Sequence, residues 1–150
     1  MKRDLTKSIT PRWLDLPKHE HPWGNLCFGQ PQQPFPFSIE RVYYIYGIPA
    51  EASRGGHAHW ENREAVFCLQ GACTLWLYSP EGKEKTYRLG HPSRGVFIPE
   101  LWWVEFGEYT DSSLILVVAS SPYRESDYIR NPEDFFLAAP FPDPVYRPRC

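Results

Sequence analysis

Short runs of β-branched and aromatic residues, broken by turn residues, follow one another along the middle of the chain. The clearest runs cover residues 38–48 (SIERVYYIYGI) and residues 112–120 (SSLILVVAS). Between them, VFCLQ and TLWLY stand on either side of Gly71, which predicts a hairpin. Such runs at intervals of roughly 8–12 residues are typical of a β-sandwich or barrel. The pattern therefore predicts an all-β domain.

The two ends of the chain depart from this pattern. Residues 1–22 are polar, irregular and interrupted by prolines, so we expect a flexible N-terminal arm there. Residues 23–140 form the expected domain, and residues 141–150 a C-terminal tail.

One short helical segment is expected near the C-terminus. Asn131 is a candidate N-cap, Pro132 suits the first helical position, and Glu133 and Asp134 favour the first turn because negative charge there is stabilised by the helix dipole.

Composition narrows the class of protein. The 150 residues suit one domain, and the 16 prolines favour short strands over long helices. A net charge of −2 without a basic block excludes nucleic acid or an anionic membrane as a partner bound through bulk charge. No secretory signal and no apolar run of about 20 residues is present, so we expect a cytoplasmic protein.

The four cysteines are Cys27, Cys68, Cys73 and Cys150, and no two are spaced as CxxC. This spacing argues against a zinc ribbon or a redox motif. We expect free thiols, with Cys68 and Cys73 packed in the core.

Candidate chemistry is concentrated in RGGHAHW, residues 54–60. Alternate side chains of a strand share a face, so His57 and His59 point the same way and Ala58 points the other. Glu64 joins that face only if the chain bends between Trp60 and Arg63. The pair is then a metal site, a proton-transfer site, or merely two structural histidines.

The spacing H-x-H-x4-E-x6-G resembles the first motif of the cupins, whose fold is a double-stranded β-helix, or jelly roll. In metal-binding cupins, two such histidines and the glutamate are ligands, and a later histidine completes the site. Here Trp103 stands near the expected position, and an indole offers no lone pair to a metal. The metal interpretation is therefore the weaker one.

A narrower resemblance lies in the ordered motifs RVYYI, RGxHAH, LxGxC and SDYIR. Over residues 24–136 the chain resembles the cupin-like sugar-nucleotide 3,4-ketoisomerases, also grouped as WxcM-like proteins. The resemblance implies an enzyme of deoxysugar biosynthesis that needs no cofactor. Its substrate would be thymidine-diphosphate-4-keto-6-deoxyglucose, whose keto group moves from C4 to C3 through an enediol.

The same resemblance implies roles for individual residues. His59 would be the base or proton shuttle, and His57 its partner. Histidine suits this task because its reference pKa of about 6.5 lies near neutrality. Arg54 would contact the substrate or its phosphates. Only one of two adjacent strand tyrosines can face inward, and we expect Tyr44 to be the one near the sugar.

Further binding candidates are Trp102, for stacking on the base, and Tyr123, at the mouth of the cavity. We expect Glu64 to hydrogen-bond a histidine or an arginine. The segment YRESDYIR is expected to serve packing around Asp127 and Arg130. The resemblance also implies a homodimer, with residues 24–30 as the candidate for strand exchange.

Two alternatives stay open on the sequence. One is a metal-dependent cupin enzyme that uses His57, His59 and Glu64. The other is a non-catalytic module that binds a nucleotide sugar, because a fold does not fix function.

Overall fold

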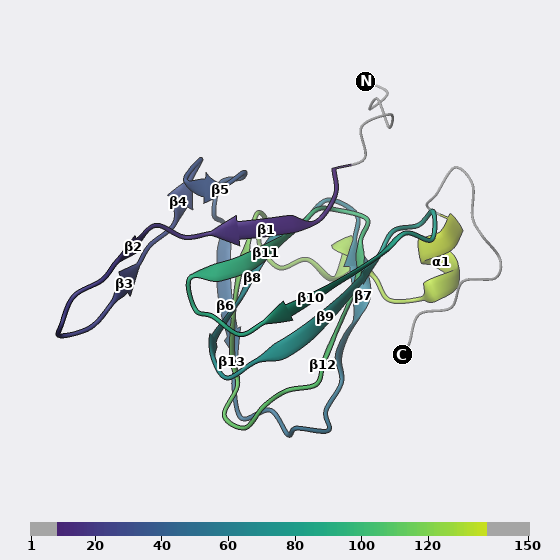
Figure 1. The fold of residues 1–150 in the computed structure, drawn as a ribbon. Helices are drawn as coiled ribbons and strands as arrows, with labels where there is room; N and C mark the ends of the chain where they lie inside the picture. The colour runs from purple at the N-terminus through teal and green to yellow at the C-terminus, as the bar shows by residue number, and fades with distance from the viewer. Residues whose placement is uncertain (1–8, 138–150) are drawn as a thin grey trace.

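The computed structural model describes residues 9–137, which form two five-stranded antiparallel sheets that face each other (Figure 1). The first sheet has the order β1 (Arg12–Asp15), β11 (Arg94–Ile98), β8 (Glu64–Gln70), β13 (Leu114–Ala119), β6 (Arg41–Ile45). The second has the order β10 (Glu84–Leu89), β9 (Cys73–Tyr78), β12 (Trp103–Gly107), β7 (Arg54–His59), β14 (Tyr128–Ile129). This architecture confirms the predicted jelly roll.

The main core lies between the two sheets, because alternate side chains of each strand point inward. Its members come from both sheets and include Val66, Leu75, Leu77, Val96, Val104, Ile115 and Val117. Cys68 and Cys73 are also buried there as free thiols, as expected. Cys150 lies outside the described residues.

The outer faces of both sheets are partly covered. On the first sheet, Phe67 and Phe97 pack against Phe35 and Phe37, next to β5 (Pro34–Phe35). On the second sheet, α1 (Pro132–Leu137) buries Phe135 completely, together with residues such as Ala58 and Trp103.

The start of α1 confirms the predicted cap. Asn131 Oδ1 accepts the N–H of Glu133 at 2.8 Å, and Pro132 is the first helical residue.

The N-terminal arm expectation is wrong for residues 12–15. They form β1, which pairs with the edge of β11, and Leu14 is only 2% exposed. The four-residue strand is too short for its alternation to be recognised, and its partner lies far along the chain, with Arg12 facing Phe97. After β1, the strands β2 (Lys18–His19) and β3 (Leu26–Cys27) form a small hairpin that extends away from the sheets (Figure 1).

The hairpin predicted around Gly71 is also wrong. β8 lies in the first sheet and β9 in the second, so the turn carries the chain from one layer to the other. Gly71 has φ +74°, and a Cβ there would come within 2.7 Å of Ser113 Oγ and Thr110 Oγ1. The turn needs glycine for this close approach. No helix within residues 9–137 is long and apolar enough to cross a membrane.

Candidate active site

The two histidines lie on β7 and face the space between the sheets, beside β14 and across from β6. Ala58 between them is fully buried on the opposite face, which confirms that His57 and His59 share a face. Their ring centroids are 5.2 Å apart. His57 is half-buried, whereas His59 is 6% exposed.

Two adjacent glycines set the position of His57. The pairing of β7 with β12 shifts register between Val104 and Glu105, where Gly55 faces Glu105 and His57 faces Val104. Gly55 and Gly56 have φ of +87° and +71°. They form a β-bulge that leaves Gly56 without a partner on β12, and such bulges re-aim the next side chain.

Glu64 lies beside His59, although the two are at odd spacing in the sequence. The chain leaves the second sheet after His59 and enters the first at Glu64, which brings Glu64 Oε1 to 3.5 Å from His59 Nε2. Tyr43 Oη and Asn62 Nδ2 donate hydrogen bonds to the same oxygen at 3.0 and 3.1 Å. Arg41 is 3.7 Å away. The expected role of Glu64 as a histidine and arginine partner fits this geometry.

The charge of Glu64 is maintained despite its burial. Burial by itself raises the pKa of this carboxyl, but the neighbouring imidazole of His59, followed by His57 and the Tyr43 hydroxyl, outweighs burial and holds the pKa below its usual value. Burial above all, and then the same carboxylate, raise the pKa of Tyr43, which stays a hydrogen-bond donor.

The expectation that Tyr44 is the tyrosine that faces inward is wrong. Tyr43 packs against the inner core and reaches Glu64, whereas Tyr44 points outward and is 64% exposed. Strand alternation correctly predicted that one of the two tyrosines faces inward. It does not show which one, because both faces of β6 carry apolar residues.

The segment YRESDYIR belongs to the site, contrary to the packing role expected for it. Asp127 Oδ2 lies 3.2 Å from His59 Nδ1. The Tyr128 ring lies 4.4 Å from the His59 ring and 5.1 Å from the His57 ring, measured between centroids. The pairing of β14 with β7, Tyr128 opposite His59, creates these contacts. No local sequence signal shows this pairing.

The environment of His57 favours its neutral form. Burial, followed by the charge of His59, lowers the pKa of His57 to about 4. A neutral imidazole at physiological pH can accept a proton at once. His57 thus has the state that a general base requires.

The three binding candidates lie in different surroundings. Arg54 is exposed at the start of β7, where it pairs with Phe106, and Tyr123 is 60% exposed beside Tyr128 at the edge of the site. Trp102 is 4% exposed in the main core, and its Nε1 donates to the carbonyl of Ile9 at 3.2 Å. This position does not fit stacking on a base.

Trp103 faces away from the histidines and packs on Phe135 behind the second sheet. Val104 instead is the β12 residue opposite His57. Among residues 9–137, no three His, Cys, Asp or Glu side chains are grouped so that they could hold a metal ion.

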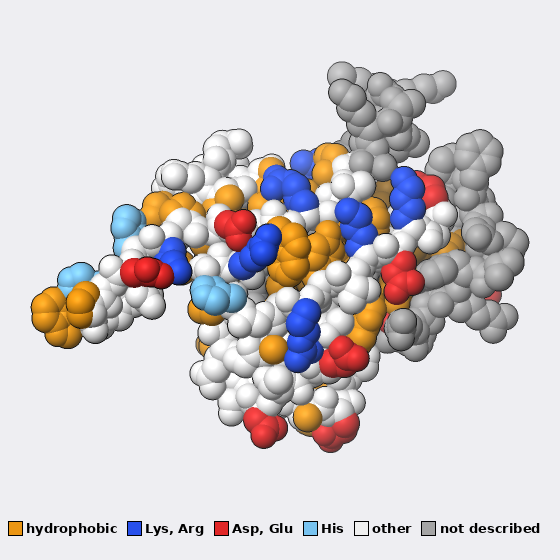
Figure 2. All heavy atoms as spheres, in the orientation of Figure 1, with side chains coloured by type: hydrophobic (Ala, Val, Ile, Leu, Met, Phe, Trp, Pro, Cys, Tyr) orange, Lys and Arg blue, Asp and Glu red, His pale blue; other side chains and the backbone are white. Residues whose placement is uncertain are grey.

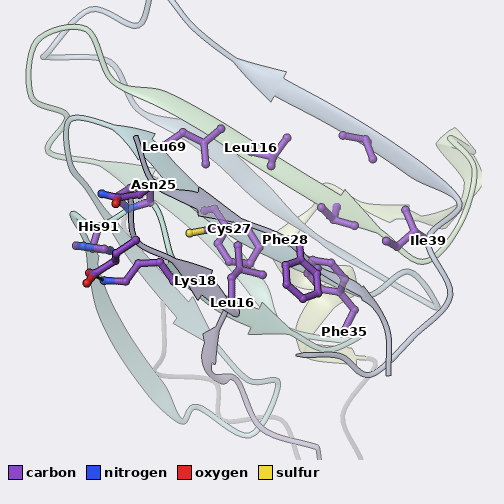
Figure 3. Close-up of a pocket in the computed structure, with 16 residues that line it drawn as sticks. Leu16, Lys18, Asn25, Cys27, Phe28, Phe35, Ile39, Leu69, His91 and Leu116 are labelled. Carbon is purple, nitrogen blue, oxygen red and sulfur yellow. Dashed lines mark ion pairs between the residues drawn. The ribbon is translucent and has the colours of Figure 1, made fainter. Parts of the chain in front are cut away.

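The larger of two described cavities lies elsewhere. It measures about 610 Å³ on the outer face of the first sheet, between the β2–β3 hairpin and residues such as Phe67 and Leu116 (Figure 3). A smaller cavity of about 290 Å³ lies beside Tyr128 and Trp60. Neither is lined by His57 or His59, and the histidines remain the candidate site because titratable side chains from several strands meet there.

A jelly roll whose inner face holds paired histidines, a tyrosine and buried carboxylates defines a cupin-like protein with groups suited to proton transfer. Residues 10–139 match the family model described as FdtA, WxcM-like, C-terminal. The chain belongs to this WxcM-like family, which confirms the resemblance seen in its sequence.

Individual relatives agree with this membership. The chain is 33% identical over 112 residues to TDP-4-oxo-6-deoxy-alpha-D-glucose-3,4-oxoisomerase of Aneurinibacillus thermoaerophilus, covering 75% of this chain and 80% of the relative. It is 31% identical to a mutant of the 3,4-ketoisomerase QdtA of Thermoanaerobacterium thermosaccharolyticum, solved in complex with TDP-4-keto-6-deoxyglucose. That match has a TM-score of 0.83 and covers 89% of this chain and 96% of the other.

A third similar protein is a 3,4-ketoisomerase from Helicobacter canadensis. It is 29% identical, with a TM-score of 0.82, and the match covers 87% of this chain and 98% of that one.

Proposed function

We propose that this protein is a sugar-nucleotide 3,4-ketoisomerase of deoxysugar biosynthesis, acting on thymidine-diphosphate-4-keto-6-deoxyglucose. The observation that carries the proposal is the histidine pair on the inner face of β7, with His59 between the carboxylates of Glu64 and Asp127. The names of the relatives support this substrate and this reaction. They do not favour the metal-dependent or non-catalytic alternatives.

The reaction needs one proton to leave C3 and one to arrive at C4. A base takes the proton from C3 while the C4 carbonyl oxygen gains a proton, which gives the enediol. The C3 hydroxyl then loses its proton as C4 is protonated, which leaves a ketone at C3 and a hydroxyl at C4. No electron acceptor is consumed, because oxidation at C3 balances reduction at C4.

The geometry favours an exchange of the roles expected for the two histidines. His57 is the more exposed and lies closer to the edge of the site, so it can reach a substrate carbon. His59 is enclosed by Asp127, Glu64 and Tyr128. We therefore assign the base to His57 and the supporting role to His59. Arg54 and Tyr123, both exposed, remain our candidates for contacting the nucleotide part.

Incubation with thymidine-diphosphate-4-keto-6-deoxyglucose, followed by NMR of the product, tests the proposal. We expect a nucleotide-linked 3-keto-6-deoxyhexose, and its coupling constants will give the configuration at C4. Activity should persist after exhaustive chelation. Tight binding without conversion would support a binding module, and activity restored only by added metal would support a metal-dependent cupin. Either result overturns the proposal.

We further propose that the protein is a cytoplasmic homodimer in which the β2–β3 hairpin of one copy covers the outer face of the first sheet of the other. Trp23 at the hairpin tip is 89% exposed, and Val42 and Tyr44 on that face are 58% and 64% exposed. Figure 2 shows the hydrophobic side chains that the end of the hairpin presents to solvent. Residues 24–30, the expected exchange segment, include β3.

Light scattering tests the dimer. We expect a mass of twice the 17.5 kDa of the chain. A Trp23→Ser variant should form a weaker dimer, which dissociates at protein concentrations at which the unaltered protein is still dimeric. A monomer for the unaltered protein at micromolar concentration would contradict it.

A further inference from the structure

We infer that Asp127 is a positioning residue that keeps a hydrogen on His59 Nδ1 and fixes the imidazole against Glu64. The inference rests on the proposed function for its catalytic consequence, and it assigns a task to η1 (Glu125–Asp127), a segment far from the histidines in sequence.

The carboxylate of Asp127 is itself held rigidly. It is 8% exposed, and its two oxygens accept the backbone N–H groups of Glu61 and Asn62 at 2.9 and 3.1 Å. The Asp127 carbonyl accepts the N–H of Trp60 at 2.9 Å. Three consecutive residues directly after His59 are thereby tied to Asp127. The carboxylate cannot turn away from the imidazole without breaking these bonds.

The His59 ring is enclosed on several sides. Asp127 Oδ2 lies 3.2 Å from Nδ1, and Glu64 Oε1 lies 3.5 Å from Nε2. A carboxylate oxygen only accepts, so a ring nitrogen can bond to it only by presenting a hydrogen, and the carboxylate of Asp127 lies closer to the ring than that of Glu64 does. The Tyr128 ring closes a third side at 4.4 Å. The shorter contact favours hydrogen on Nδ1 and one ring orientation, the task that a second group commonly performs for a functional histidine.

This arrangement leaves one nitrogen for exchange. With hydrogen kept on Nδ1 beside Asp127, His59 can gain and lose a proton only at Nε2. This nitrogen faces Glu64, which also accepts a hydrogen bond from the Tyr43 hydroxyl. The ring of His59 therefore supports proton movement on the side of Glu64 and Tyr43, 5.2 Å from the His57 ring. Loss of Asp127 should impair the chemical step more than substrate binding.

The first test uses the unaltered protein and needs no substrate. Long-range ¹H–¹⁵N spectra of the imidazole rings, with His59 assigned by the loss of its signals in His59→Asn, report which nitrogens carry hydrogen. We expect hydrogen on Nδ1 of His59 near neutral pH. A neutral ring with hydrogen on Nε2 alone would overturn the inference, whether or not the protein is a ketoisomerase.

The second test is kinetic. Asp127→Asn keeps the size of the side chain but replaces an acceptor by a donor. We expect kcat to fall by about 10²-fold or more, with KM within about threefold, and the hydrogen to leave Nδ1 in the same spectra; a comparable substitution in serine proteases costs about 10⁴-fold. Unchanged kcat in the folded variant would overturn the inference.

Ser120→Ala is the matched control for loosening the same loop. Ser120 Oγ accepts the N–H of Arg63 at 2.8 Å and donates to Asn62 Oδ1 at 3.4 Å. We expect a lower Tm with kcat and the His59 spectrum unchanged. An equal loss of kcat in Ser120→Ala would show that Asp127 acts only by holding the loop in place, which would overturn the inference. If Asp127→Asn does not fold, the spectra of the unaltered protein still test whether His59 carries hydrogen on Nδ1.

Discussion

The two histidines differ in their surroundings, so their substitutions should differ in effect. His57→Asn removes the proposed base, and we expect kcat to fall by about 10²–10⁴-fold, the usual contribution of general acid–base catalysis. His59→Asn should lower kcat less, because His59 supports the base without being it. Rates measured with the same substrate and near-UV circular dichroism as a folding check compare the two. An inactive His59→Asn beside an active His57→Asn would restore His59 as the base.

The low pKa of His57 also predicts an acid-sensitive protein. In the unfolded chain His57 titrates near 6.5, whereas in the folded protein its pKa is about 4. Between these values the unfolded state binds more protons, so the free energy of unfolding falls as the pH decreases from about 6.5 towards 4. The lowered pKa of Glu64 acts in the same direction, because the free energy of unfolding falls further once the pH drops below the usual pKa of a glutamate.

Urea unfolding at several pH values between about 7.5 and 4 measures this dependence. His57→Asn should lose less stability on acidification than the unaltered protein, and the acid limb of kcat/KM should lie near the lowered pKa of His57. Identical pH profiles of stability for the two proteins would show that the titration of His57 is not the cause.

The sequence could identify the histidines because alternation in a strand fixes their common face. It could not choose between Tyr43 and Tyr44, because the phase of β6 depends on which sheet face is covered. It could not find Asp127 as a histidine partner either, since Asp127 is distant from His59 in the sequence and only the pairing of β14 with β7 joins them.

Among the elements, β7 depends on its glycine bulge. A Cβ on Gly55 would lie 2.5 Å from the Val104 carbonyl oxygen, whereas one on Gly56 meets nothing within 4 Å. Both have positive φ, so each alanine variant carries backbone strain of about 1–3 kcal/mol. Gly55→Ala must in addition push β7 from β12 and move His57. We expect it to lose more stability and more activity than Gly56→Ala, as measured by urea unfolding and kcat. Equal effects would show that the bulge does not position His57.

Long strands with strong β propensity were predictable, as residues 38–48 and 112–120 show by containing β6 and β13. The layer change at Gly71 was not, because a tight glycine turn fits a hairpin and a crossover between sheets equally well. β1 escaped prediction because only its distant partner β11 makes a four-residue segment a strand.

Taken as one structure, the jelly roll encloses the proposed proton-transfer site between its sheets and leaves its largest described cavity on an outer face. The fold class followed from strand spacing, and the family followed from the ordered motifs. The division of labour between the histidines needed coordinates, since it depends on exposure and on carboxylates contributed by β8 and η1.

Turnover of thymidine-diphosphate-4-keto-6-deoxyglucose in deuterium oxide, followed by NMR of the sugar ring, examines the proton transfer itself. We expect a 3-keto product that carries deuterium at C4, and no such product from His57→Asn. A 3-keto product formed at full rate with ordinary hydrogen at C4 would contradict exchange through an enediol at this histidine pair.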